Sequence, residues 1–188
     1  NCIDEEVKVE IGHVTEQVGA AAYAALQRAV DDLAEGLIDV LVTAPINKHT
    51  MQSAEFNFPG HTEYLQERLG GEGDKALMIL LNDTLRVALV TGHMPLAQIS
   101  ATLSQELIVE KLKIFEESLR HDFGVRKPRI AVLSLNPHAG ENGLLGAEEN
   151  DIIIPAIDEA KKGGMLCFGP YAADGFFGTE HFKKFDGV

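Results

Sequence analysis

The clearest pattern in the chain is a series of apolar residues spaced three or four apart between residues 18 and 37. This spacing places them on one face of a helix, and Gly36 marks its end. The β-branched run 38–43 that follows is typical of a strand buried on both faces of a parallel sheet. The chain therefore opens with a predicted helix followed by a predicted strand.

The same reading predicts further alternating elements. Helices are expected at 62–69, 104–123 and 148–163, and strands at 76–81, 85–90 and 129–135. The first two of these strands are separated by a turn at Asn82 and can pair as an antiparallel hairpin. Ser104 is placed as the N-cap of the long helix, and Pro155 marks either a kink or a late first turn in the last one. The expected fold class is α/β, with a mixed sheet flanked by helices.

Composition limits the function classes. The 188 residues carry a formal net charge of −13, which argues against a nucleic-acid partner bound through general basicity. No apolar run is long enough to span a bilayer and the acidic start is unlike a signal peptide, so we expect a cytoplasmic protein without a membrane partner. Cys2 and Cys167 form no CxxC motif, and we expect no disulfide between them.

Two histidines follow predicted strands directly. His93 comes after the strand at 85–90, and His138 comes after the strand at 129–135. Because loops after parallel strands meet at one edge of an α/β sheet, the two imidazoles are expected to approach each other and could bind a divalent metal. The alternative is that both are ordinary loop histidines. A metal site needs a further ligand, for which the candidates are His61, Asp174, Glu141, a residue beyond Val188 or one from a partner subunit.

Two other segments have the character of anion sites. The sequence Gly-His-Thr-Glu at 60–63 precedes a predicted helix, whose first backbone N–H groups favour a phosphate or carboxylate. Lys48 follows a strand end and a proline at a predicted helix start, where its ammonium could meet a phosphate. The alternatives are that Thr62 simply caps the helix and that Lys48 is a solvated surface residue.

Five motifs, in this order, resemble one enzyme family. They are Ala-Pro-Ile-Asn-Lys at 44–48, Phe-Pro-Gly-His-Thr-Glu at 58–63, Thr-Gly-His-Met-Pro-Leu at 91–96, Leu-Asn-Pro-His-Ala-Gly-Glu at 135–141 and Gly-Pro-Tyr-Ala-Ala-Asp at 169–174. Together they resemble the 4-hydroxythreonine-4-phosphate dehydrogenase family. The resemblance implies oxidation of the 3-hydroxyl of 4-phosphohydroxythreonine with NAD or NADP. Decarboxylation then yields 3-amino-2-oxopropyl phosphate, in pyridoxal phosphate (vitamin B6) synthesis.

The resemblance also implies roles for single residues. His61 and Thr62 match the family's substrate-contacting pair, with Lys48 as a further substrate candidate. His93 and His138 match two of three histidines that bind a divalent metal, for which Zn, Mg and Co are candidates. The third histidine is expected beyond Val188.

Asp174 remains open between a proton acceptor and a group that orients an imidazole. The resemblance assigns no cofactor-binding residue. Leu144 departs from the family, because many relatives carry a histidine there, and the consequence of this change stays open.

The resemblance further implies a fold like that of isocitrate and isopropylmalate dehydrogenases and a homodimer with the active site at its interface. Both ends of the chain are expected to be cuts, so that the sequence is a fragment of a two-domain enzyme. Residues 1–44 would belong to the first domain, and residues 45–188 to a truncated substrate- and metal-binding domain.

Three other functions remain open at this point. A sister dehydrogenase of the same fold would act on a sugar-acid 4-phosphate such as erythronate or threonate 4-phosphate. A metal-dependent hydrolase would use the same histidines to activate water. An isolated 188-residue piece could also be an inactive metal- or phosphate-binding module.

Overall fold

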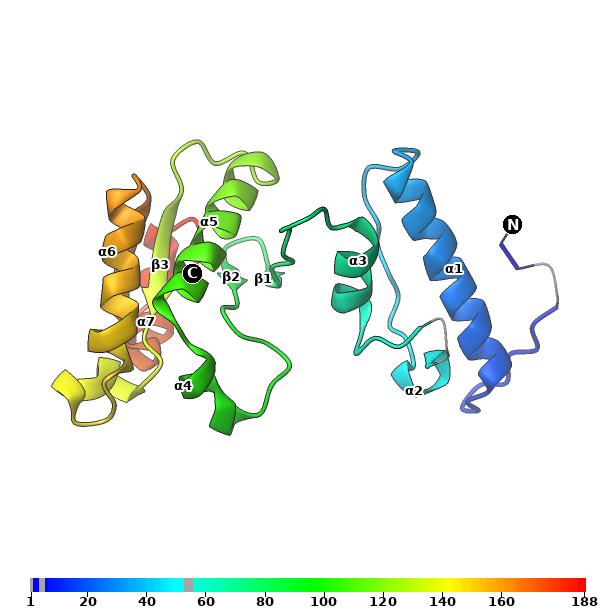
Figure 1. Cartoon of the computed structure of the whole chain (residues 1–188), viewed down its shortest axis with the longest axis horizontal. Helices are drawn as coiled ribbons and strands as arrows, with labels where there is room; N and C mark the ends of the chain where they lie inside the picture. The colour runs from blue at the N-terminus through cyan, green and yellow to red at the C-terminus, as the bar shows by residue number, and fades with distance from the viewer. Residues whose placement is uncertain (1, 4–5, 53–55) are drawn as a thin grey trace. The chain divides into compact units, whose positions relative to one another are not determined.

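The computed structural model describes residues 2–3, 6–52 and 56–188 and divides the chain into two compact units, Asn1–Ala76 and Leu77–Val188 (Figure 1). The domain boundary predicted between residues 44 and 45 lies inside the first unit. Leu41 and Ile46, on either side of it, pack against the same core cluster. As a limit between the domains of a longer enzyme, this boundary stays a prediction.

The first unit is helical in the part that the structure describes. Its helices are α1 (Glu16–Ala34), α2 (Lys48–Met51) and α3 (His61–Leu69), which confirm the predicted helices at 18–37 and 62–69 within a few residues. The hydroxyl of Thr15 accepts a hydrogen bond from the Val18 N–H and starts α1. The core of this unit consists of Leu26, Val30, Met51, Phe56 and Tyr64.

The strand predicted at 38–43 is wrong for this structure. The segment forms no strand, and no strand occurs among residues 2–3, 6–52 and 56–76 that could pair with it. Because a strand is stabilised by hydrogen bonds to a neighbour, a β-branched composition alone does not form one. The side chains of Val40 and Val42 are exposed, whereas Leu41 between them is half-buried.

The second unit contains two pairs of strands. β1 (Ile79–Leu81) and β2 (Arg86–Ala88) are antiparallel, which confirms the predicted hairpin with shorter strands. The Asn82 side chain closes the turn by accepting hydrogen bonds from the Thr84 and Leu85 N–H groups. β3 (Arg129–Leu133) confirms the predicted strand at 129–135 and runs parallel to β4 (Leu166–Tyr171), which the pattern analysis did not predict. The sheet arrangement is therefore mixed, as expected.

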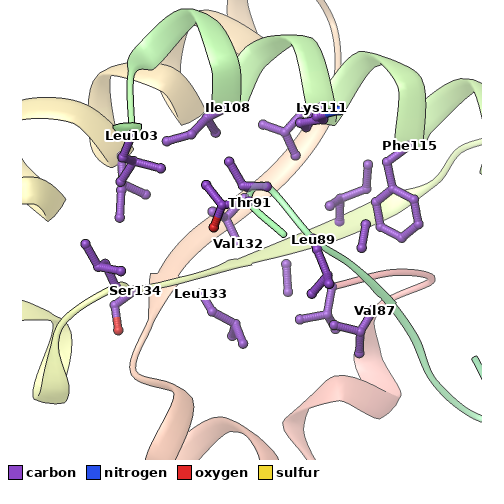
Figure 2. Close-up of a pocket in the computed structure, with 18 of the residues that line it drawn as sticks. Val87, Leu89, Thr91, Leu103, Ile108, Lys111, Phe115, Val132, Leu133 and Ser134 are labelled. Carbon is purple, nitrogen blue, oxygen red and sulfur yellow. The ribbon is translucent and has the colours of Figure 1, made fainter. Parts of the chain in front are cut away.

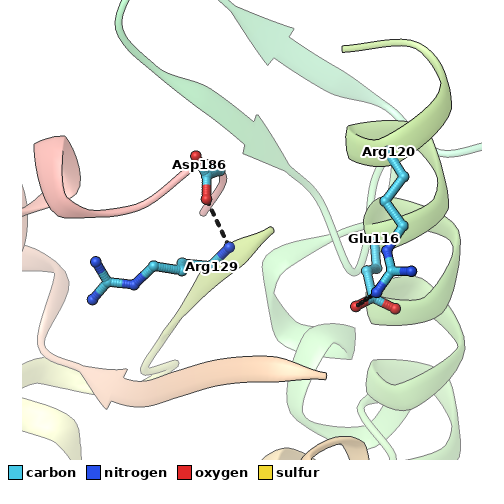
Figure 3. A network of polar contacts seen from close by, with 4 residues as sticks. All are labelled: Glu116, Arg120, Arg129 and Asp186. Carbon is cyan, nitrogen blue, oxygen red and sulfur yellow. Dashed lines mark hydrogen bonds and ion pairs between the residues drawn. The ribbon is translucent and has the colours of Figure 1, made fainter. Parts of the chain in front are cut away.

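Gly187 and Val188 connect the two pairs. Val188 N–H donates to the Arg86 carbonyl and the Val188 carbonyl accepts from Ala88 N–H, both at 2.8 Å. Gly187 makes a parallel bridge with Ile130 of β3. This segment thus runs parallel to both β2 and β3. The carboxylate of Asp186 accepts from the Arg129 N–H at 2.8 Å and fixes the register where β3 begins (Figure 3).

Helices α5 (Gln105–His121) and α6 (Ile154–Lys162) cover the β3–β4 pair and confirm the predicted helices at 104–123 and 148–163. Ser104 caps α5, since its hydroxyl accepts from the Leu107 N–H. Pro155 lies in the first turn of α6, which is the second of the two predicted alternatives. A π-helical turn, η3 (Glu149–Ile153), precedes α6. The shared core is built around Phe115, Leu119, Ile130, Ile157 and Cys167.

An aromatic cluster lies beyond β4 and holds the last helices. Phe176 of α7 (Ala173–Gly178) is buried, and its ring stacks on Tyr171 with centroids 5.3 Å apart. The shorter elements are α4 (Ile99–Thr102) and the 3₁₀ turns η1 (Leu96–Gln98), η2 (Pro137–Gly143) and η4 (His181–Lys184). Both cysteines are free in this structure. None of the helices in the described residues combines the length and apolar character required to cross a bilayer.

Candidate functional site

His93 and His138 lie in loops that follow β2 and β3. Both are exposed, and both have a left-handed backbone, with φ of 50° and 52°. A non-glycine residue with positive φ is uncommon, although histidine is enriched among the exceptions, and such strain gathers at binding sites. Since the two preceding strands are joined in parallel through Gly187 and Val188, both loops leave the same edge of the sheet.

Asp174 lies beside His138. Its Oδ2 atom is 2.9 Å from Nδ1 of the imidazole, and its Oδ1 atom accepts from the Gly175 N–H at 2.9 Å. Asp174 is in the first turn of α7, which buried Phe176 anchors. A carboxylate on Nδ1 fixes the orientation and tautomer of an imidazole and leaves Nε2 as the nitrogen that binds a metal. The pair therefore has the geometry of a metal-binding histidine with its supporting carboxylate.

The backbone around His138 is unusual over several residues. All residues from 138 to 142 have positive φ, between 45° and 76°, within the turn η2. Only Gly140 adopts this conformation without steric cost, because an L side chain in the left-handed region costs about 1–2 kcal/mol per residue. Other contacts must therefore hold the turn in place.

Glu149 supplies such contacts. Its side chain is 2% exposed, and it is the buried charged residue of the described part of the chain. Oε1 accepts from the Leu135 N–H at 2.8 Å and from the Asn136 N–H at 2.7 Å. Oε2 accepts from the Asn136 amide at 2.9 Å and would lie 2.6 Å from a Cβ placed on Gly140. The carboxylate thus packs directly under the turn that carries His138.

The ionised form of Glu149 is favoured in this position. Burial raises the pKa of its carboxyl group, but the hydrogen bonds from the Asn136 side chain and from the backbone outweigh this effect and lower the pKa below its usual value. The Asn136 amide also donates to Glu148 at 2.7 Å, and Glu148 accepts from the Ser100 hydroxyl. The pKa of Glu148 is lowered by the hydrogen bond from Ser100, then by that from Asn136. Two carboxylates therefore hold one amide.

The residues predicted to contact substrate lie together in the first unit. Gly60 is the N-cap of α3 and provides no side-chain hydrogen bond to the first turn, which begins at His61 and Thr62. Thr62 therefore is not the cap, which was one alternative for this residue. Lys48 extends its ammonium beside Gly60, since a Cβ placed on that glycine would lie 3.6 Å from Lys48 Nζ. The side chain of Asn47 fixes the start of α2 by accepting from the His49 and Thr50 N–H groups.

The described residues do not form a complete metal site by themselves. Within residues 2–3, 6–52 and 56–188, no three His, Cys, Asp or Glu side chains are grouped so that they could hold a metal ion. Glu141, one of the candidates for the further ligand, is exposed in the turn η2, and Leu144 beside it is also exposed.

An apolar cavity of about 290 Å³ lies between β2 and β3 and beneath α5 (Figure 2). Its lining includes Val87 and Leu89 at β2, Val132 and Leu133 of β3, and Val188. Thr91 and Ser134 are among the few polar residues of its wall. The cavity thus follows the two strands that lead toward His93 and His138.

The sequence predicts both histidines as site residues, but it does not predict the left-handed turn of His138 or the buried Glu149 carboxylate that packs under this turn. The left-handed turn had only a weak signal, the several glycines from 140 to 146. The role of Glu149 could not be predicted, because the helix dipole alone already explains an acidic residue at the start of a predicted helix.

Comparisons with known proteins agree on one family. The sequence model of the family described as pyridoxal phosphate biosynthetic protein PdxA matches residues 1–188. A 4-hydroxythreonine-4-phosphate dehydrogenase of Bacteroides thetaiotaomicron is 60% identical over 188 residues, which are 100% of this chain and 51% of the relative. One from Burkholderia vietnamiensis is 43% identical over 179 residues, covering 90% of this chain and 52% of the relative.

Solved structures give the same result. The 4-hydroxythreonine-4-phosphate dehydrogenase of Klebsiella pneumoniae matches with a TM-score of 0.83 at 36% identity, over 96% of this chain and 55% of that one. The chain spans about half the length of the curated relatives it matches.

Proposed function

Because the chain belongs to the family of the pyridoxal phosphate biosynthetic protein PdxA, we propose that it carries part of an NAD- or NADP-dependent dehydrogenase. The substrate is 4-phosphohydroxythreonine, oxidised at its 3-hydroxyl and then decarboxylated to 3-amino-2-oxopropyl phosphate on the way to pyridoxal phosphate. The observation that carries this proposal is the 60% identity, over the whole chain, to a relative named 4-hydroxythreonine-4-phosphate dehydrogenase. A cytoplasmic location stays a prediction.

His93 and His138 are proposed ligands of a divalent metal such as Zn, Mg or Co. The donor set fits, because both are exposed imidazoles at one sheet edge and His138 has a carboxylate on Nδ1. A bound metal would supply Lewis acidity to the substrate oxygen during oxidation and decarboxylation. Asp174 is assigned the orienting role rather than that of proton acceptor, since both of its oxygens are already engaged, with His138 and with Gly175.

The further ligand is proposed to come from residues after Val188 or from the partner subunit of a homodimer. The hydrogen bonds of Gly187 and Val188 support the first source, because they direct the chain between β2 and β3, parallel to both. Residues that continue in this direction would run along the cavity of Figure 2 toward the edge that carries His93 and His138. Such a residue would complete the three protein ligands typical of a catalytic metal site.

The substrate phosphate is proposed to bind at the start of α3, near Lys48. The first-turn N–H groups of His61 and Thr62 receive no side-chain cap, so they remain suited to an anion. The Lys48 ammonium beside Gly60 adds a positive charge at this point, where the Glu63 carboxylate also lies. The net charge of −13 makes such local donors necessary for a phosphorylated substrate.

In the proposed reaction, hydride passes from the substrate carbon to the nicotinamide, and the hydroxyl proton is released. The chain's part is to bind the substrate and hold it in line with the cofactor.

The test compares reduction of NAD and NADP by the full-length gene product with 4-phosphohydroxythreonine, erythronate 4-phosphate and threonate 4-phosphate as substrates. Turnover of the first substrate with carbon dioxide release is expected. Activity on the sugar-acid phosphates alone would refute the proposed substrate, and phosphate release without any nicotinamide would instead indicate a hydrolase.

A further inference from the structure

We propose that Glu149 is a positioning residue for His138. This inference rests on the proposed metal site but concerns a residue outside it. Glu149 does not contact His138. It contacts the two residues before the turn, Leu135 and Asn136, and it lies under Gly140 inside the turn.

Glu149 is buried and has a complete set of hydrogen-bond donors. A carboxylate that is 2% exposed is stable only where hydrogen bonds replace water, and Glu149 receives three, two of them from backbone N–H groups. These donors come from the residues that determine where β3 ends and the turn begins.

The side chain of Asn136 is oriented by two carboxylates. Its Nδ2 atom donates both to Glu149 at 2.9 Å and to Glu148 at 2.7 Å, so its two amide hydrogens each meet a carboxylate. A glutamine at position 149 would place its NH₂ group either against the Asn136 NH₂ group or against the backbone N–H groups of Leu135 and Asn136. Flipping Asn136 would remove the first conflict but would turn its oxygen toward the Glu148 carboxylate. The arrangement therefore requires a carboxylate at position 149.

The backbone of the turn that carries His138 is strained. The residues from 138 to 142 all have positive φ, and a turn of this kind persists only where its surroundings determine it. Glu149 binds the entrance of the turn and fills the space below Gly140. Removing the charge should therefore let His138 move away from Asp174 without disturbing the core of the unit.

The experiment measures two properties of the full-length protein with Glu149→Gln, using Glu148→Gln as the matched control. Glu148 contacts the same amide but makes no bond to the backbone of Leu135 or Asn136. In titration calorimetry with Zn²⁺ alone, Glu149→Gln should weaken binding about 10-fold or more, the usual effect of losing a supporting group, and Glu148→Gln should weaken it less. Equal Zn²⁺ affinity in Glu149→Gln and wild type, or an equal loss in both variants, would overturn the proposal.

Amide hydrogen exchange of the metal-free protein supplies the second readout. The Leu135 and Asn136 amides should exchange about tenfold faster in Glu149→Gln, because a neutral acceptor replaces a charged one, while Ile130 in β3 should keep its protection. If Glu149→Gln does not fold, hydrogen exchange of the wild type tests the proposal. Leu135 and Asn136 amides that exchange as fast as fully exposed amides would refute it. A wild-type protein that binds no Zn²⁺ would refute only the proposed metal ligands. The hydrogen exchange of the Leu135 and Asn136 amides would still test whether Glu149 holds the start of the turn.

Discussion

Replacing Gly140 with alanine should destabilise the second unit strongly, although the change adds a single methyl group. Gly140 has φ of 76°, a conformation that costs an alanine about 1–2 kcal/mol. The added Cβ would also lie 2.6 Å from Glu149 Oε2 and 2.9 Å from the Gly146 carbonyl oxygen. Relief requires the carboxylate to move, which weakens hydrogen bonds to a charged group worth about 1.5–3 kcal/mol each.

The expected total is therefore about 3–5 kcal/mol, a large part of the roughly 5–15 kcal/mol that stabilises a typical domain. Gly143→Ala is the matched control. Gly143 also has positive φ, but its added Cβ would meet no atom within 4 Å. It should show only the backbone cost of about 1–2 kcal/mol.

Urea unfolding followed by circular dichroism measures both variants under the same conditions. The reasoning is refuted if Gly140→Ala loses no more stability than Gly143→Ala. A second check is a double-mutant cycle with Glu149→Ala, which removes the carboxylate that the new methyl group would strike. The combined loss should then be smaller than the sum of the two single losses, because the residues share one contact.

Three further outcomes are expected. His93→Ala or His138→Ala in the full-length protein should greatly reduce metal content measured by elemental analysis, and stoichiometric metal in both variants would remove them as ligands. Asp174→Asn should weaken Zn²⁺ binding about 10- to 100-fold, because the His138 imidazole loses its charged partner; unchanged affinity would contradict the orienting role. Iodoacetamide should label exposed Cys2 in the folded protein but not Cys167, since burial raises the pKa of the Cys167 thiol to about 11. Mass spectrometry of the folded and the urea-unfolded protein measures the labelling. Equal labelling rates of Cys2 and Cys167 in the folded protein would contradict the prediction.

The elements predicted correctly are those whose signals are local. Helix α5 has a regular apolar face, a serine N-cap and a glycine after its end, and all three signals lie within its own sequence. The β1–β2 hairpin likewise combines two apolar runs with the turn at Asn82. Such elements can be predicted because the residues that determine them are close together in the chain.

The errors concern elements that depend on distant partners. The segment 38–43 has the composition of a strand, yet strand formation needs a neighbour that the described residues of its unit do not supply. β4 was missed for the opposite reason. Gly169 and Pro170 interrupt its apolar pattern, but pairing with β3 through Ile130 and Cys167 holds it in the sheet.

The candidate site shows the same division between local and distant signals. His138 could be found from its small, turn-forming neighbours, and Asp174 was named as a group that could orient an imidazole. That His138 is the imidazole it meets depends on a different element, held by aromatic packing that no local pattern predicts. The link between the loops of His93 and His138 is also distant in sequence. It depends on Gly187, where a Cβ would lie 2.4 Å from the Phe115 ring, so that only glycine lets the chain pass beneath α5 and join β2 to β3. The parallel arrangement of the two strands that lead to these loops therefore depends on a glycine that is distant from both histidines in the sequence.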